Sequence, residues 1–537
     1  MCKINNIVIV AGGKNTRFKE MSIFPKILLP MNDYPSILSK DCDLFKDKTI
    51  YLIINSDYEQ MTKDYINNNH LNVKLLVSHN ANGSSNTLKA LYDKLPRYNT
   101  LLIWSDLILS NEAFEDIQEG LKNLSKRFAV ITKEGNYRFK IENNQVVNIE
   151  KNELGNVPGI YYYKIAPIFD YKENDYSNYD FIEYIRDFHK NKIEEIPLKE
   201  TSNIFEFRDL EIYLKYYLNN NILSENTRKT RFFNSITKID NNTLCKKCIH
   251  PDYYHLIDKE IDWYNIVKNH NLSCIPQIYK ADKENHEIDM EYLDGYQTLY
   301  QYVKSEKDLN KIKDLFKRYL KAIEELHNIK KEEVRYDDVS DDYYKEFYFK
   351  VIERCDKISG MLINYNKEDL KKNLQEAINI IFKETLPKDL PFTYYTFCHG
   401  DLNGSNVMYN PKTKNIKFID PRGYFGYTHN VGMPEYDYAK VCYFLSGYDD
   451  FNINHYIYTK NNYTEPHKII NYKPKSLKKP IYDIMVGIIW IALAQYISQN
   501  IFKANIAYEY GLKILKSALI KYKKYQKYKN GINNTSI

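Results

Sequence analysis

The chain has 537 residues, of which 43% are hydrophobic and 27% are charged, and its formal net charge is +6 at pH 7. This length exceeds what one hydrophobic core usually supports, so we expect two or three globular domains. The charge is mild for the length and gives no indication of a nucleic-acid partner. Eight scattered cysteines, with no secretory leader before them, indicate reduced thiols in a cytoplasmic protein.

A continuous apolar segment, Asn6–Ala11, predicts a strand in a buried position of a parallel sheet. Gly12 and Gly13 follow this strand, and glycines at a strand end let backbone amides approach phosphates. Arg17 can neutralise the charge that remains, and Lys26 lies in a second short motif, PKILLP. The sequence therefore predicts a phosphate-binding loop at the end of the first strand.

Strands and helices then alternate, as they do in α/β domains. We expect strands at Thr49–Asn55, Val73–Val77 and Thr100–Trp104, with a helix between the first two. The segment Asn82–Thr87 opens another helix and is rich in backbone donors and hydroxyl groups. Ser105 and Asp106 follow the third strand, and an aspartate at such a position can cap a helix.

The two motifs together, AGGxxTRF and PKxLxP, resemble those of the sugar-phosphate and phosphocholine nucleotidyltransferases, a family with a Rossmann-like α/β fold. The resemblance implies that Gly83 and Ser84 read the nucleobase and that Asp106 binds Mg²⁺. A second metal carboxylate is also implied, for which the pattern leaves Glu206 and Asp209 open. The nucleotide-binding and catalytic residues implied at the first strand end are Ala11, Gly12, Gly13, Arg17 and Lys26.

A helix predicted at Asp209–Asn219 closes this first domain, which we expect to span residues 1–222, and a polar break follows it. The next domain contains a predicted strand with two adjacent lysines. Strand alternation places Lys246 on the same face as Leu244 and Cys248, which favours Lys246 over its neighbour as a buried functional lysine. Its expected acidic partner is Glu260 on the following helix.

The second half of the chain is organised around FCHGDLNGSNVMYNPKTKNIKFIDPRG, residues 397–423. Asp401 and Asn406 have the spacing H-G-D-x-x-x-x-N, and Asp420 ends the apolar strand that follows. Kinase catalytic loops share this order, in which one Asp accepts the proton of the acceptor hydroxyl and an Asn and a second Asp hold magnesium. The pattern predicts phosphoryl transfer from ATP.

These residues resemble the aminoglycoside phosphotransferase and choline kinase family, small-molecule kinases with a bilobal, protein-kinase-like α+β fold. We expect this domain over residues 228–537. The resemblance implies that Asp401 is the catalytic base and that Asn406 and Asp420 bind Mg²⁺. The nucleotide-binding residues that it implies are Lys246, Glu260 and, in the strand leading to the inter-lobe hinge, Glu291.

Four later features carry weaker predictions. The acceptor stays open: the 51 tyrosines can supply an aromatic cage for choline, and Arg422, beside the metal-binding motif, suits an anionic or polyol acceptor equally well. Asp437 is expected to support structure rather than chemistry. The apolar stretch Ile484–Ile497 is too short to span a bilayer and is expected to form a buried helix. The tail Lys521–Ile537, rich in Lys, Tyr and Asn, is expected to be frayed.

The two motif sets predict a bifunctional enzyme that phosphorylates a small alcohol or sugar with ATP and activates the phosphate with CTP or another NTP. The pairing resembles phosphocholine activation and, more broadly, the synthesis of capsular and other cell-surface precursors, an analogy at the level of folds. Nucleotides and a small molecule are thus the expected partners, without nucleic acid or a membrane span. Two alternatives are a regulatory nucleotide-binding protein with degenerate sites and a protein kinase with an accessory domain.

Overall fold

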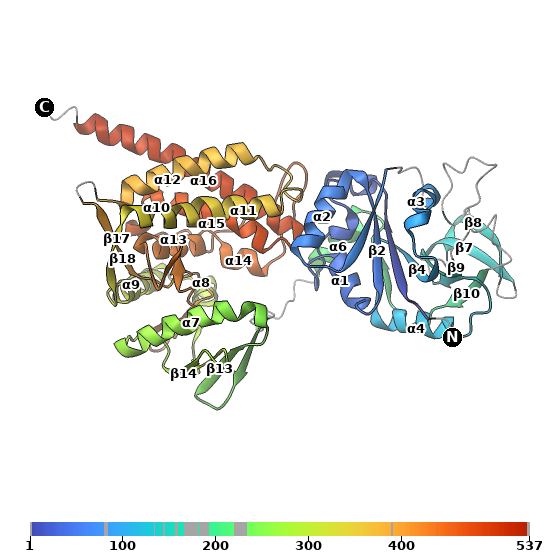
Figure 1. Ribbon diagram of the computed structural model, residues 1–537, viewed down its shortest axis with the longest axis horizontal. Helices are drawn as coiled ribbons and strands as arrows, with labels where there is room; N and C mark the ends of the chain where they lie inside the picture. Colours follow the sequence, from blue (N-terminus) through green and yellow to red (C-terminus); the bar gives the residue numbers. More distant parts are fainter. Residues whose placement is uncertain are drawn as a thin grey trace.

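Figure 1 shows an α/β domain from the N-terminal part of the chain beside a larger, two-lobed domain from the rest. The predicted domain boundary, between residues 222 and 228, lies outside the described residues. The computed structural model describes residues 3–79, 84–133, 135–142, 145–155, 159–165, 181, 193–219, 233–387 and 390–533.

The first domain is built on a seven-stranded sheet with the order β10-β6-β9-β4-β1-β2-β3. Neighbouring strands are parallel except at β9, which runs antiparallel to β4 and β6. This sheet confirms the Rossmann-like α/β fold and the predicted strands of the first domain. The strands are β1 (Asn6–Ala11), β2 (Thr49–Asn55), β3 (Val73–Ser78), β4 (Tyr98–Trp104), β6 (Phe128–Thr132), β9 (Ile160–Ile165) and β10 (Ile193–Pro197).

Both faces of this sheet are buried, which explains why its central strands are apolar throughout. Ile7 and Ile9 of β1 belong to one hydrophobic cluster, and Val8 between them belongs to another on the opposite face. The helices of the domain are α1 (Ile37–Leu44), α2 (Glu59–Asn68), α3 (Ser84–Ala90), α4 (Asn111–Leu121) and α6 (Leu210–Asn219). Smaller strand pairs are β5 (Leu107–Leu109) with β11 (Ile204–Glu206), and β7 (Gly135–Glu142) with β8 (Gln145–Gly155).

The first lobe of the second domain is an antiparallel sheet with the order β12-β13-β15-β14, packed against one long helix. Its elements are β12 (Asn234–Lys238), β13 (Thr243–Cys248), α7 (Tyr254–Val267), β14 (Ile278–Asp282) and β15 (Glu287–Glu291). Such a lobe beside a mainly helical one is the bilobal α+β arrangement that the kinase motif predicts.

The second lobe is mainly helical, and short strand pairs hold the segment predicted to be catalytic. Its helices are α8 (Leu299–Ser305), α9 (Leu309–His327), α10 (Tyr336–Tyr344), α11 (Lys350–Lys357), α12 (Lys367–Thr385), α13 (Pro434–Leu445), α14 (Tyr448–Ile453), α15 (Pro480–Tyr496) and α16 (Ile501–Asn533). Its strands are β16 (Gln297–Thr298), β17 (Lys331–Arg335), β18 (Phe392–Phe397), β19 (Val407–Tyr409), β20 (Ile416–Phe418), β21 (Tyr424–Phe425), β22 (Thr428–His429) and β23 (Val431–Gly432).

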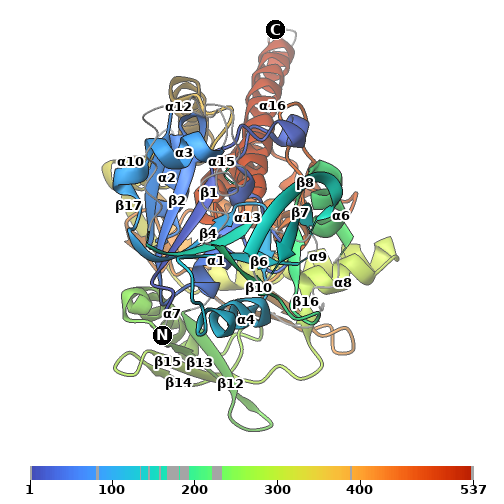
Figure 2. The same ribbon diagram turned by 90° about the vertical axis from the view of Figure 1, so that its right-hand side faces the viewer.

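Helices α15 and α16 test the predictions of a buried apolar helix and of a frayed C-terminal tail. Helix α15 is buried along most of its length, as predicted. The prediction of a frayed tail is wrong up to Asn533, because α16 continues to that residue and projects beyond the rest of its domain (Figure 2). The last four residues of the predicted tail lie outside the described residues. Within the described ranges, none of the helices combines the length and the apolar character that crossing a membrane would need.

The two domains touch through α2 and α6 of the first domain (Figure 1). On α2, the Tyr65 hydroxyl donates to the Gln499 carbonyl oxygen at 2.7 Å, and the Asp64 carboxylate accepts the backbone N–H of Gly360 at 2.7 Å. Asn68 of the same helix accepts a hydrogen bond from the Gln495 side chain at 2.7 Å. The contact therefore involves specific polar partners on both sides.

Candidate active sites

The first candidate site lies where β1 and β4, parallel neighbours in the sheet, end side by side. Gly12 and Asp106 follow these strands at the same sheet edge, the edge at which open α/β sheets bind ligands. Gly12 is buried, and its carbonyl oxygen accepts a hydrogen bond from Asn55 Nδ2 at 3.3 Å. A Cβ atom at Gly12 would lie 3.0 Å from the Thr87 side chain, so a larger residue would crowd this turn.

Lys26 and Asp106 form an ion pair in this site, with Lys26 Nζ 3.2 Å from Asp106 Oδ2. The same ammonium donates to the carbonyl oxygen of Phe207 at 3.3 Å and lies 4.7 Å from the centre of the Phe18 ring. The two side chains are only 11% and 24% exposed. A fixed, shielded cation at the sheet edge is suited to stabilise negative charge that develops on a phosphate.

The other residues predicted for this site differ in their burial and in whether the structure describes them. Ala11 ends β1 and is buried, whereas Gly13 and Arg17 are exposed. Ser84 begins α3, and Gly83 lies outside the described residues.

The two candidates for a second metal carboxylate have different partners. Asp209 Oδ1 accepts the backbone N–H of Ile212 at 3.1 Å and so caps α6. Glu206 Oε2 accepts a hydrogen bond from Arg208 Nε at 2.8 Å. In the β5–β11 ladder Glu206 is paired with Leu107, the residue after Asp106.

The second candidate site is centred on Lys246, whose Nζ lies 2.6 Å from Glu260 Oε2 and 2.9 Å from Asp420 Oδ1. These side chains come from β13, from α7 and from the end of β20. Burial lowers the pKa of Lys246, but the charges of Asp420 and Glu260 outweigh it, so the pKa is raised. Lys247 is exposed and pairs with Glu287, which confirms the strand register predicted from alternation.

The loop before Asp401 is held in place by Asp437, which is completely buried. Its carboxylate accepts the backbone N–H groups of His399 at 3.0 Å and Gly400 at 2.7 Å, and it lies 3.0 Å from His327 Nε2. Burial raises the pKa of Asp437, but the hydrogen bond and charge of His327 outweigh it and the pKa is lowered. Asp437 thus makes the structural contacts that were expected of it. Gly400 adopts a φ of 80° in this turn, a conformation that glycine reaches at little cost.

His399 connects the loop to the segment after β20 that contains Asp420. Its Nε2 lies 3.1 Å from the Ile419 carbonyl oxygen, and its Nδ1 accepts the backbone N–H of Asp401 at 3.3 Å. Burial lowers the pKa of His399, which favours the neutral ring with its proton on Nε2. The loop and the strand end are therefore fixed relative to each other.

Both oxygens of the Asp401 carboxylate have partners. Asn406 Nδ2 donates to Asp401 Oδ2 at 3.0 Å, and Lys440 Nζ lies 3.0 Å from Asp401 Oδ1. Lys440 comes from α13, is 12% exposed, and lies 5.3 Å from the centre of the Tyr443 ring. The sequence interpretation missed Lys440; the available signal was its position three residues after Asp437, which puts both on one helix face.

Oxygen atoms that suit Mg²⁺ are present in this second site. Asn406 donates its amide N–H groups to Asp401, which leaves its amide oxygen for a ligand. Asp420 has a φ of 56°, which is uncommon for a residue other than glycine and is typical of a constrained functional position. Carboxylate and amide oxygens are the donors that Mg²⁺ prefers, so these residues fit the predicted ion. No group of three or more His, Cys, Asp or Glu side chains in the described ranges is arranged to hold a metal.

The Arg422 side chain, which in the sequence suited an anionic or polyol acceptor, has a carboxylate partner inside the protein. Its two terminal nitrogens donate to both carboxylate oxygens of Glu346 at 2.8 and 2.7 Å, and Glu346 is only 2% exposed. Burial raises the pKa of Glu346, but the charges of Arg422 and Lys350 outweigh it and hold the pKa well below its usual value. Arg422 therefore has an internal structural partner.

Glu291 has internal partners as well. Its backbone N–H donates to the Gln277 carbonyl oxygen at 2.8 Å, and its carboxylate accepts the backbone N–H of Gln277 at 3.0 Å. The backbone N–H is thus used within the first lobe, and the carboxylate also lies 3.5 Å from Lys417 Nζ on β20 of the second lobe.

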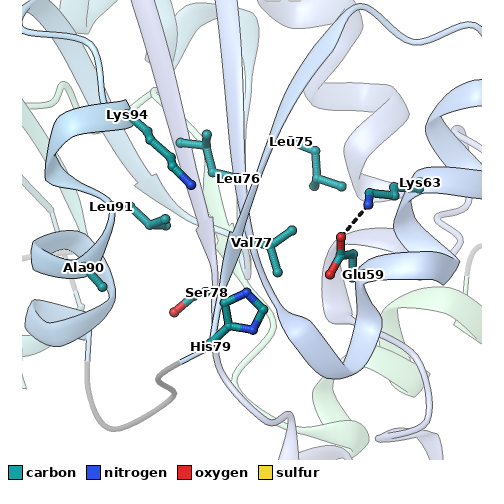
Figure 3. A pocket seen from close by; sticks show the side chains of 10 residues that line it. All are labelled: Glu59, Lys63, Leu75, Leu76, Val77, Ser78, His79, Ala90, Leu91 and Lys94. Carbon is teal, nitrogen blue, oxygen red and sulfur yellow. Dashed lines mark hydrogen bonds and ion pairs between the residues drawn. The ribbon is translucent and has the colours of Figure 1, made fainter.

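A separate pocket of about 500 Å³ flanks the edge strand β3 (Figure 3). Glu59 and Lys63 pair on one side of the strand, and Leu91 and Lys94 lie on the other, with His79 at the strand end. None of the residues predicted for either site lines this pocket, so we assign no chemistry to it.

Comparison with known proteins identifies the class of the second domain. Residues 225–459 match the family model of the phosphotransferase enzyme family. The matched part includes Lys246, Glu260, Asp401, Asn406 and Asp420. The C-terminal part of the chain therefore contains a phosphotransferase-family domain, which confirms the resemblance drawn from its motifs.

Solved structures similar to this chain include three transferases. The inositol-1-phosphate CTP transferase from T. maritima is 11% identical, covering 39% of this chain and 91% of its own with a TM-score of 0.33. A putative glucose-1-phosphate thymidylyltransferase from Bacillus anthracis is 17% identical, covering 43% and 98% with a TM-score of 0.35. The CTP:phosphocholine cytidylyltransferase from Streptococcus pneumoniae is 17% identical, covering 40% and 97% with a TM-score of 0.32. A search of curated proteins gave no match.

Proposed function

We propose that the chain is a bifunctional enzyme with a kinase domain at residues 228–537 and a nucleotidyltransferase domain at residues 1–222. The kinase phosphorylates a small alcohol or sugar with ATP, and the transferase joins that phosphate to a nucleotide. One observation supports the proposal: each domain brings together, from distant parts of the sequence, charged side chains that the motifs predict to bind phosphates or metal. These are Lys26 with Asp106, and Lys246 with Glu260 and Asp420.

In the kinase reaction, Asp401 accepts the proton of the acceptor hydroxyl as its oxygen attacks the γ-phosphorus of ATP, and ADP leaves. Lys246, held by Glu260, orients the ATP phosphates. Asn406 and Asp420 would hold Mg²⁺, which when bound neutralises phosphate charge.

We assign Lys440 the task of orienting the base. Asn406 and Lys440 hold separate oxygens of the Asp401 carboxylate, so the side chain is restricted to one orientation.

In the transferase reaction, an oxygen of the phosphorylated acceptor attacks the α-phosphorus of the NTP, and pyrophosphate leaves. Lys26 stabilises the charge on the attacked phosphate, while Gly12, Gly13 and Arg17 bind the remaining phosphates. Asp106 would hold Mg²⁺. We favour Glu206 over Asp209 as its companion, because the Asp209 carboxylate already caps α6.

The two reactions fit in series, because the first makes a phosphomonoester and the second consumes one. CTP is our first candidate for the NTP, on the strength of the motif resemblance, and a cell-surface precursor is the proposed product class. The work of such an enzyme belongs in the cytoplasm, where ATP and CTP are available.

A screen of alcohols and sugars with ATP, Mg²⁺ and each NTP, read by mass spectrometry, tests this proposal. We expect a nucleotide-linked product that requires ATP, one NTP and one acceptor together. Phosphorylation of a casein-like protein with no small-molecule product would instead support the protein-kinase alternative. Nucleotide binding without turnover of any acceptor would support a regulatory protein.

A further inference from the structure

The nucleotide loop of the first domain, residues 12–29, is packed against the second domain. Phe24, two residues before Lys26, is completely buried. Its ring centre lies 5.8 Å from that of Tyr458 and 5.5 Å from that of Phe502, both in the second domain. The loop that carries Lys26 is therefore supported from outside its own domain.

A backbone contact supports the same loop nearby. The backbone N–H of Lys460 donates to the Glu20 carbonyl oxygen at 3.1 Å, within the short helix Thr16–Met21 that contains Arg17. Lys460 lies in the segment His455–Tyr463, which we call the interdomain segment. Arg17 and Lys26, the two charged side chains proposed to act on the NTP phosphates, thus lie close in sequence to contacts with this segment.

Aromatic rings continue the contact from the other side of the loop. Tyr213 and Tyr217 of α6 are stacked with ring centres 5.8 Å apart, and Tyr217 lies 6.1 Å from Phe502. Tyr213 in turn lies 6.0 Å from Phe18, the ring beneath the Lys26 ammonium. A line of packed rings therefore runs from Lys26 to the second domain.

The interdomain segment is also attached to the kinase catalytic loop. It follows α14, where Asp449 accepts the backbone N–H of Gly404 at 3.1 Å. The neighbouring Asp450 accepts the hydroxyl of Tyr456, in the interdomain segment, at 3.1 Å. The interdomain segment thus contacts the nucleotide loop of the first domain and also the helix α14, which holds the kinase catalytic loop.

We propose that the second domain is a structural part of the nucleotidyltransferase site, with Tyr458 and Phe502 as positioning residues. They hold Phe24 and so fix Lys26 against Asp106. This inference rests on the proposed nucleotidyl transfer. The two motif sets suggested domains that work separately, yet the loop geometry on which Lys26 depends is completed by the kinase domain. A misplacement of about 1 Å in a catalytic group can cost roughly a hundredfold in rate, so lost support should be measurable.

The test uses the full-length chain with Tyr458→Leu, which keeps apolar volume but removes the ring. Tyr458→Phe is the rescue variant, because it keeps the ring. Tyr472→Leu is the matched control, since Tyr472 is a half-buried tyrosine of the same domain whose ring lies 5.9 Å from Phe316, within that domain. The readouts are pyrophosphate release from CTP and phosphocholine, ADP release from ATP and choline, and backbone hydrogen exchange over residues 16–24.

We expect Tyr458→Leu to lower kcat for pyrophosphate release by at least about tenfold. Its nucleotide loop should exchange faster, while its kinase activity stays near the wild-type value. Tyr458→Phe and Tyr472→Leu should match the wild type in all three readouts. Unchanged loop exchange in Tyr458→Leu would overturn the inference, as would unchanged kcat in an active enzyme. A wild-type protein that releases no pyrophosphate with any NTP and any phosphorylated acceptor from the screen contradicts the proposed function instead. Hydrogen exchange of the loop then tests on its own whether the second domain supports it.

Discussion

Lys246 and Lys247 are neighbours in the sequence but have opposite environments in the fold. A buried lysine is costly unless it is paired, and Lys246 meets two carboxylates, whereas Lys247 lies on the exposed face. The sequence predicted this difference because the two-residue period of a strand sets which side each residue faces. Beyond the position of Lys440 on the same helix face as Asp437, it did not show Lys440 beside Asp401 or Glu346 beside Arg422, because each contact joins a helix to a loop that is distant in the sequence.

Lys246→Met should therefore lower kinase kcat/KM by about a hundredfold or more, because it removes a fixed cation from the ATP phosphates. Lys247→Met is the matched control and should retain wild-type turnover. Steady-state ADP release, with circular dichroism to check folding, measures the effect. Equal losses in the two variants would contradict the assignment.

Lys440→Met should lower kinase kcat by roughly ten- to a hundredfold while leaving KM for ATP near its original value, because it loosens the base and not the nucleotide. Lys440→Arg should restore part of the activity. Lys473→Met serves as control, since Lys473 pairs with Asp483 at 2.7 Å elsewhere in the same lobe. A Lys440→Met enzyme with normal kcat would show that the Lys440–Asp401 pair has no part in catalysis.

At the level of elements, buried strands were the easiest to predict and the C-terminal helix was the hardest. Short, continuous apolar runs such as β1 and β2 are typical of buried strands in a globular protein, so their structure was readily predicted. The tail appeared too polar to be ordered, yet Tyr522 is 6% exposed and its hydroxyl donates to Glu384 at 2.6 Å. Lys523 also pairs with Glu376 on α12 at 2.8 Å. Because these contacts between α16 and α12 are made by polar side chains, the sequence of the tail has no apolar stripe from which a packed helix could be predicted.

Helix α14 provides a pH-dependent prediction, because burial raises the pKa of Asp449 from 3.8 to about 7. The fold therefore favours the protonated form, and between roughly pH 4 and pH 7 the folded state binds more protons than the unfolded state. Asp449 thus makes the free energy of unfolding fall as pH rises through that window, by at most about 1.4 kcal/mol per pH unit.

Asp449→Asn should remove this component of the pH dependence. Thermal melts of both proteins at about pH 5 and about pH 8 measure it. The wild type should lose more stability than the variant over this change. Identical losses would mean that Asp449 ionises in the folded protein as it does in water.

At the scale of the whole molecule, the sequence predicted two domains and two sites but not their contact. Each motif set contains the residues of one site and says nothing about the surface of its domain. The contact between the domains depends on those surfaces, so the motifs could not predict it. The interdomain contacts of Phe24 and Tyr217 come from aromatic residues that any hydrophobic core could use. The proposed chemical independence and the proposed structural dependence are compatible, because in the proposal the second domain supports the nucleotide loop and both phosphate-binding side chains, Arg17 and Lys26, belong to the first domain.

The most direct test of the bifunctional assignment compares Asp401→Asn with Lys26→Ala, each given the free alcohol and the phosphorylated compound. Asn is nearly isosteric with Asp, so Asp401→Asn should remain folded, lose phosphorylation of the alcohol by roughly a hundredfold or more, and still release pyrophosphate normally from the phosphorylated compound. Lys26→Ala should show the reverse, with normal phosphorylation and about a hundredfold loss of pyrophosphate release. If either folded variant loses both reactions, or if Lys26→Ala keeps full pyrophosphate release, the assignment of one reaction to each domain is contradicted.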